Sequence, residues 1–160
     1  VFRNSEWQSN MFAELSKRGR LHGPSGIDYF IFPRGLIKLP PFAVGRPGWD
    51  SWLLYKMKIS GVPIIDATES ITIIHQNHDY SHSKFGEKKR VAGPEFQQNI
   101  KIAGGWSRML TLREADLVLS GKSLKKPGFP ERFFSILAIF YPWRIFLAAK
   151  RKFQNLIKYS

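Results

Sequence analysis

The sequence predicts an α/β fold, one domain in size, that continues into a basic helical tail. Two short segments, residues 62–66 and 71–75, are almost wholly apolar, which is typical of strands buried on both faces of a sheet. Other segments place apolar residues at helical spacing and are bounded by glycine or proline. A chain of 160 residues with 43% apolar composition is long enough to bury one core.

The elements follow from these patterns in chain order. We expect helices over residues 5–18, 49–60 and 94–103, and strands over residues 29–32, 62–66 and 71–75. The first helix shows Trp7, Met11, Phe12 and Leu15 on one face, and Gly19 is its expected stop. The third begins with a proline, whose missing N–H costs little there, and ends at two glycines. Residues 110–120 have a mixed pattern that predicts no regular element.

The C-terminal part has a different character, so we divide the chain into residues 1–121 and a tail, residues 122–160. The tail holds nine Lys and Arg residues against the single acid Glu131. Residues 133–149 are almost wholly apolar, but Pro142 and Arg144 interrupt them and a spanning helix needs about twenty apolar residues. We therefore expect helices lying in a membrane interface, with packing against another part of the protein as the alternative.

The formal charge of +13 predicts a polyanionic partner. Because the charge is concentrated in the tail and in residues 84–90, we favour an anionic membrane surface over nucleic acid. Cysteine is absent, which excludes disulfides and thiolate catalysis and fits a reducing compartment. We expect a cytoplasmic protein, peripheral at the inner face of the membrane. The chain begins with Val1, and we interpret it as a fragment of a longer protein.

Asp50 is the candidate general base. It lies between Trp49 and Trp52 at an expected helix start, where an aspartate also serves as an N-cap. Flat indole faces suit the C–H faces of a sugar ring. They also exclude water from a neighbouring carboxylate, which raises its pKa and makes it a better base.

Three of the four histidines lie within residues 75–82, directly after an expected strand. His75 and His78 converge only if the chain turns after Ile74, and Asn77 and Asp79 favour such a turn. Neutral imidazole is a common metal ligand, so His75 and His78 are candidate ligands of a divalent metal. His82 is expected in a surface loop. Asp28, before the expected strand at residues 29–32, either caps its loop or binds substrate.

Several ordered motifs carry a family resemblance. They are HGPSGIDYFIFPRG within residues 19–35, PPFAVGRPGWDSWLLY at 40–55, PIIDAT at 63–68, IHQNHDYSH at 74–82, AGGWSR at 103–108 and TLREAD at 111–116. In this order they resemble a family of bacterial glycosyltransferases of the GT-A, or nucleotide-diphosphosugar transferase, type. The resemblance covers about residues 19–120, and the tail lies outside it.

The resemblance implies a partial GT-A-like mixed sheet and the acceptor-side half of a transferase, since the chain shows no Asp-x-Asp metal motif. It implies that Asp50 deprotonates an acceptor hydroxyl and that His75 or His78 completes the shell of Mn or Mg. Gly48, Trp49, Trp52, Arg46 and Asp28 would bind substrate. The partners implied are a nucleotide-diphosphosugar donor and a carbohydrate or lipid-linked acceptor.

Two other classes of function compete with this one. A metal-dependent nuclease or nucleic-acid-binding protein is suggested by the His-Gln-Asn-His string at residues 75–78 and by the high charge. Such nuclease sites need a ββα-metal frame, whereas here the helix at residues 49–60 precedes both strands. A non-catalytic, membrane-docked carbohydrate-binding or scaffolding module is the third class.

Overall fold

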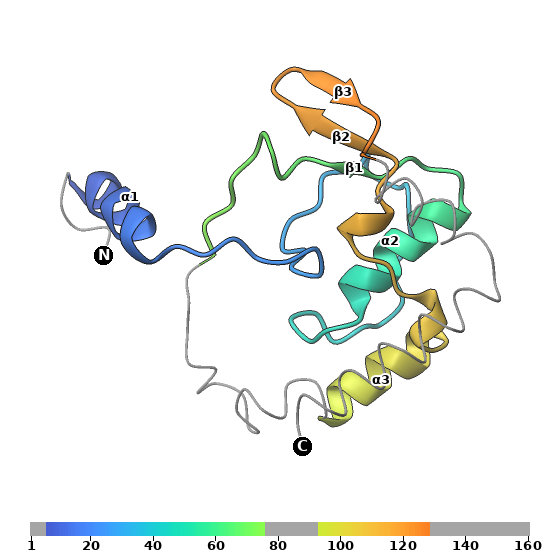
Figure 1. The fold of residues 1–160 in the computed structure, drawn as a ribbon. Helices are drawn as coiled ribbons and strands as arrows, with labels where there is room; N and C mark the ends of the chain where they lie inside the picture. The colour runs from blue at the N-terminus through green and yellow to red at the C-terminus, as the bar shows by residue number, and fades with distance from the viewer. Residues whose placement is uncertain (1–5, 76–92, 129–160) are drawn as a thin grey trace.

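The computed structural model describes residues 6–75 and 93–128 of the chain (Figure 1). The described part is a mixed α/β structure whose helices are α1 (Trp7–Arg18), α2 (Trp49–Ile59) and α3 (Pro94–Ala103). Its strands are β1 (Ile65–Asp66), β2 (Leu117–Ser120) and β3 (Ser123–Lys125), and two short 3-10 helices are η2 (Trp106–Arg108) and η3 (Leu112–Glu114). Within these two ranges, no helix is long and apolar enough to cross a membrane.

All three predicted helices form. Gly19 and Gly104 follow α1 and α3 as expected, and Gly104 has the left-handed backbone (φ 80°) that lets the chain leave a helix without a Cβ clash. In Figure 1, α1 stands to one side of the other elements, and none of its residues is fully buried. Trp7, Met11 and Leu15 are half-buried, but Phe12 is mostly exposed, so the apolar face of α1 is narrower than its pattern indicates.

The sheet is small and has the order β1-β2-β3. Strand β1 pairs with β2 in parallel, Ile65 opposite Leu117, and β2 pairs with β3 as an antiparallel hairpin, Leu119 opposite Leu124. Residues 121–122 make the turn, where Gly121 has φ 60°. The hairpin was not expected from the sequence, and β3 lies within the predicted tail.

Two strand predictions are wrong and a third is much reduced. Residues 29–32 and 71–75 form no strand, and only Ile65–Asp66 of residues 62–66 pairs with another strand. Nor are these segments buried on both faces, since Ile31 is 81% and Ile65 is 45% exposed. A strand needs a partner for its N–H and C=O groups. Among the described residues, the three predicted strands find such a partner only where Ile65 and Asp66 pair with β2.

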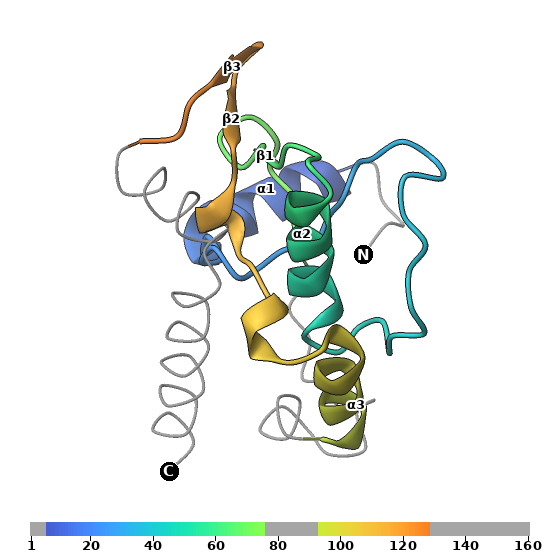
Figure 2. The ribbon, with the colours of Figure 1, turned by 90° about the vertical axis from the view of Figure 1, so that its right-hand side faces the viewer.

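The core lies between α2, α3 and the chain that follows α3. One cluster groups the buried side chains Ile27, Leu53, Leu54, Met57, Ile64, Leu110 and Ala115. A second groups Trp52, Ala103 and Met109. In Figure 2, α2 lies between the β2–β3 hairpin at one end of the described structure and α3 at the other.

A buried ion pair joins α2 to the sheet. The Lys58 side chain is 5% exposed, and its Nζ donates to the Asp116 carboxylate and to the Glu114 carbonyl oxygen (2.8 Å). Asp116 also accepts from the Ile64 backbone N–H (2.9 Å), directly before β1. The last turn of α2 and the starts of β1 and β2 therefore share one polar centre.

Candidate functional site

Asp50 lies in the first turn of α2 and not at its N-cap, which is Gly48. Gly48 is buried with φ 109°, a backbone conformation that favours glycine, and an added Cβ would approach Met109 Cε to 3.3 Å, so that the Met109 side chain would have to shift. The Asp50 Oδ1 atom accepts from the backbone N–H groups of Gly48 (3.1 Å) and Ser51 (2.7 Å). Among the described residues, its Oδ2 atom accepts no hydrogen bond.

Burial raises the pKa of the Asp50 carboxyl above its ordinary value. Exclusion of water is the largest cause, and the backbone N–H groups of Ser51 and Gly48 oppose it. The negative charge of Asp28 raises the pKa further and is the smallest of these causes. A carboxylate in this environment is a stronger base than a solvated one.

Asp28 is held beside α2 by its neighbours. Ile27 is buried in the first core cluster, and the Phe30 ring packs on Trp49 with centroids 5.4 Å apart. The backbone of Pro24 also accepts a hydrogen bond from Leu112 N–H (3.0 Å) at η3. The loop at residues 22–30 is therefore fixed although it forms no regular element.

Two imidazoles share the Asp28 carboxylate. His75 Nδ1 lies 3.3 Å and His22 Nδ1 lies 3.6 Å from Asp28 Oδ2, and the two rings are 5.8 Å apart. All three side chains are partly exposed. The contact of Phe30 with Trp49 sets the loop that carries Asp28 beside the first turn of α2, and we call His22, Asp28, Asp50 and His75 the acid–base cluster. It combines a desolvated carboxylate with a second carboxylate and two imidazoles.

The two tryptophans beside Asp50 have different environments. Trp52 is 9% exposed and packs on Phe42 with ring centroids 5.1 Å apart, in the second core cluster. It is a core side chain with little surface left for a sugar. Trp49 is only partly buried at the edge of the first cluster, so Trp49 is the indole that remains available to a ligand.

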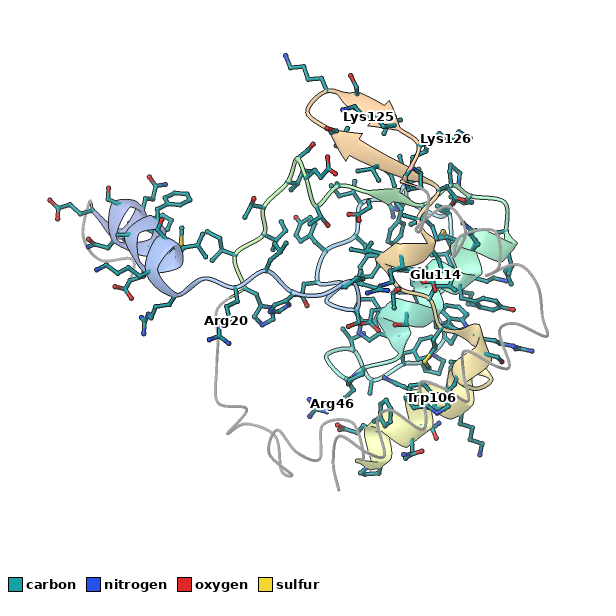
Figure 3. The ribbon with its side chains drawn as sticks, in the orientation of Figure 1. Arg20, Arg46, Trp106, Glu114, Lys125 and Lys126 are labelled. Carbon is teal, nitrogen blue, oxygen red and sulfur yellow. The ribbon has the colours of Figure 1, made fainter. Side chains whose placement is uncertain are left out.

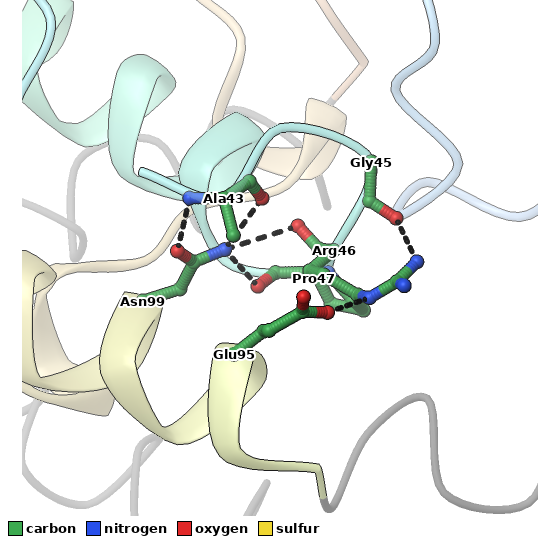
Figure 4. Close-up of polar contacts among 6 residues, drawn as sticks. All are labelled: Ala43, Gly45, Arg46, Pro47, Glu95 and Asn99. Atoms are coloured by element: carbon green, nitrogen blue, oxygen red, sulfur yellow. Dashed lines mark hydrogen bonds and ion pairs between the residues drawn. The ribbon is translucent and has the colours of Figure 1, made fainter. Parts of the chain in front are cut away.

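Asn99 fixes the loop that leads into Asp50. Its side chain is fully buried on α3, where Oδ1 accepts from Ala43 N–H (2.9 Å) and Nδ2 contacts the carbonyl oxygens of Ala43, Arg46 and Pro47 at 3.0, 3.3 and 3.2 Å (Figure 4). The Arg46 guanidinium pairs with Glu95 in the first turn of the same helix. Arg46 thus fastens the loop to α3, and an anionic substrate would have to compete with Glu95 for it.

The predicted metal ligands are only partly described. His78 lies outside the described residues, and His75 faces Asp28. Among residues 6–75 and 93–128, no three His, Asp or Glu side chains come together in a way that could hold a metal ion. The described residues alone do not fit a metal site.

Reasoning from the sequence missed His22 and Asn99. His22 stands alone in a glycine- and proline-rich loop, and nothing local links it to residues 28 and 75. Asn99 did carry a signal: Phe96, Asn99 and Ala103 share one helical face, so a polar side chain lies in an apolar stripe.

Comparison with known proteins identifies no family for this chain. No protein-family model matches the chain, and neither a curated protein nor a solved structure matches it. The resemblance to GT-A glycosyltransferases therefore stays a prediction.

Proposed function

We propose that this chain is the acceptor-side part of a glycosyltransferase, with Asp50 as its general base. The observation that carries the proposal is the acid–base cluster itself. A desolvated carboxylate whose pKa is raised stands beside Asp28, which contacts His75, and beside the accessible indole of Trp49. A general base can take the proton of a hydroxyl, and a flat indole ring beside it can stack on the sugar that carries that hydroxyl.

The proposed reaction is displacement at the anomeric carbon of a nucleotide-diphosphosugar. The acceptor oxygen forms the new bond to that carbon as the bond to the diphosphate oxygen breaks. The acceptor proton moves to Asp50 Oδ2, the oxygen that accepts no hydrogen bond from the described residues. Oδ1 stays anchored to the backbone of Gly48 and Ser51, so the acceptor meets a fixed carboxylate.

The other residues of the cluster have supporting roles. Burial keeps the pKa of Asp50 raised and the negative charge of Asp28 adds to it, while His22 and His75 contact the Asp28 carboxylate and hold it in place. Trp49 would stack on the acceptor sugar. Gly48 acts through its backbone by orienting Asp50. A GT-A-like sheet completed by further strands, and a Mn or Mg ion held by His75 and His78, remain parts of the proposal that rest on the resemblance.

Transfer by the purified protein that contains this chain together with its donor-binding part tests the proposal. The protein is incubated with radiolabelled uridine and guanosine diphosphosugars and a panel of mono- and disaccharide acceptors, and labelled product is separated from donor. We expect transfer for one donor class. Removal of a general base costs about 10²- to 10⁴-fold, so Asp50→Asn should lose at least about 100-fold in rate.

Asp66→Asn is the matched control, because Asp66 ends β1 outside the acid–base cluster and accepts from Thr68 N–H (2.9 Å). It should transfer at the wild-type rate. Turnover by Asp50→Asn equal to wild type would remove Asp50 from the role. Acceptor binding without transfer to any donor would favour the non-catalytic module, and cleavage of plasmid DNA in a parallel assay would favour the nuclease.

A further inference from the structure

The small sheet exposes an apolar face that belongs to neither core cluster. Side chains alternate between the two faces of a strand, and paired residues point to the same face. The register Ile65–Leu117 and Leu119–Leu124 therefore puts Ile65, Leu117, Leu119 and Leu124 on one side of the sheet. Ile65 is 45% and Leu124 is 53% exposed, and the other two are partly buried. We call these four residues the apolar sheet face.

Exposed lysines lie along the same hairpin. Lys122 is in the turn and Lys126 follows β3, whereas Lys125 pairs with Val118 and points to the opposite side of the sheet from Leu124. The hairpin projects from the molecule at the end opposite α3 (Figure 3), and the labelled Glu114 lies in the body below it. Residues 117–126 contain no Asp or Glu, so the hairpin has a charge of +3. The nearest acid along the chain, Asp116, pairs with Lys58.

The chain after the hairpin has the same character. Its apolar segment, residues 133–149, begins seven residues after Lys126 and is flanked by Arg132 and by Lys150, Arg151 and Lys152. Packing of this basic tail onto the hairpin would bring like charges together, which is unfavourable. A negatively charged surface would instead favour both segments at once.

We propose that the β2–β3 hairpin docks on an anionic lipid surface, with the apolar sheet face toward the acyl boundary and Lys122 and Lys126 at the headgroups, while Lys125, on the opposite side of the sheet, adds to the charge of the hairpin. Each lysine near such a surface contributes about 1 kcal/mol, or roughly fivefold in affinity. Burial of the Ile65 and Leu124 side chains adds to this. The apolar sheet face shares no residue with the acid–base cluster, and the proposal does not depend on sugar transfer.

The absence of cysteine allows a probe at one site. A Leu124→Cys variant of the full chain is labelled with an environment-sensitive nitrobenzoxadiazole dye, and Gln98→Cys, on the exposed side of α3, is the control position. On addition of phosphatidylglycerol-containing vesicles we expect a blue shift and brighter emission at position 124 only. Pure phosphatidylcholine vesicles should produce no shift.

Charge removal tests the lysines independently. In vesicle sedimentation, the triple variant Lys122→Gln, Lys125→Gln, Lys126→Gln should bind anionic vesicles at least about tenfold more weakly than wild type. The matched triple Lys38→Gln, Lys101→Gln, Arg113→Gln removes three exposed charges elsewhere and should bind more tightly than the hairpin triple.

Three results would overturn the proposal. The chain sediments with anionic vesicles while the dye at position 124 does not shift, which would assign docking to the tail alone. The dye is already blue-shifted without vesicles, which would show that protein covers the apolar sheet face. A DNA duplex shifts the dye and vesicles do not, which would make nucleic acid the partner.

Discussion

Two regions of the molecule contrast sharply. The region built on α2 and α3 buries two apolar clusters and satisfies its polar groups through Asn99 and Lys58. The segments around residues 29–44 and 65–74 are as apolar in sequence, yet many of their large side chains are exposed, Ile31 and Ile73 among them. A helix satisfies its own backbone, whereas a strand depends on a second strand. Apolar content alone therefore predicts burial in the first region only.

The largest effect expected from this contrast is at Leu53. Leu53 is 2% exposed at the centre of the first cluster, and Leu53→Ala should lower the free energy of unfolding by about 4 kcal/mol. Ile31→Ala, in a predicted strand that does not form, should cost less than about 0.5 kcal/mol. Urea denaturation followed by tryptophan fluorescence compares them. Equal losses would mean that residues 29–32 are buried in solution.

Asn99 gives the next largest effect. Asn99→Ala removes the amide that bonds the buried N–H and carbonyl groups of the loop at residues 43–47. The variant should lower the free energy of unfolding by about 3 kcal/mol. Gln98→Ala, one position away on the exposed side of α3, is the control and should be nearly neutral. If the two variants unfold at the same urea concentration, the loop at residues 43–47 is held by something other than Asn99.

The ion pair below the sheet gives a smaller effect. Asp116→Ala removes the carboxylate partner of the buried Lys58 ammonium, which also donates to the Glu114 carbonyl oxygen, and should cost about 2 kcal/mol, because Asp116 is itself a third exposed. Glu69→Ala, an exposed acid in the turn after β1, controls for the loss of one negative charge. A loss as large in Glu69→Ala would point to net charge as the cause.

The smallest effect on stability is expected at Asp50. Its pKa is raised on folding, so ionisation costs more in the folded chain, and its contribution to stability falls as pH rises from the unfolded pKa through the folded one. Above that window Asp50→Asn should be as stable as wild type or more stable. Thermal unfolding at pH 7 measures this. A clear loss of stability would assign Asp50 a structural role.

The sequence predicted what is local in this molecule. Periodicity and terminal glycines located all three helices of the described residues, and the Gly48-Trp49-Asp50 segment was placed correctly at a helix start. The sequence did not predict which distant segments pair with one another. Nothing in the sequence indicated that β2 would pair with both β1 and β3, or that His22 would join His75 at Asp28. Trp49 and Trp52 looked equivalent, and only packing distinguishes the core ring from the accessible one.

The ionisation of Asp50 tests the proposed function most directly. Carboxyl carbon NMR of the labelled chain gives the pKa of Asp50 in wild type and in Asp28→Asn. We expect a pKa above the ordinary value of 3.8 in wild type and a lower one in Asp28→Asn, because the variant lacks the neighbouring negative charge. A wild-type pKa at or below 3.8, unchanged in Asp28→Asn, would contradict both the desolvated base and its closeness to Asp28.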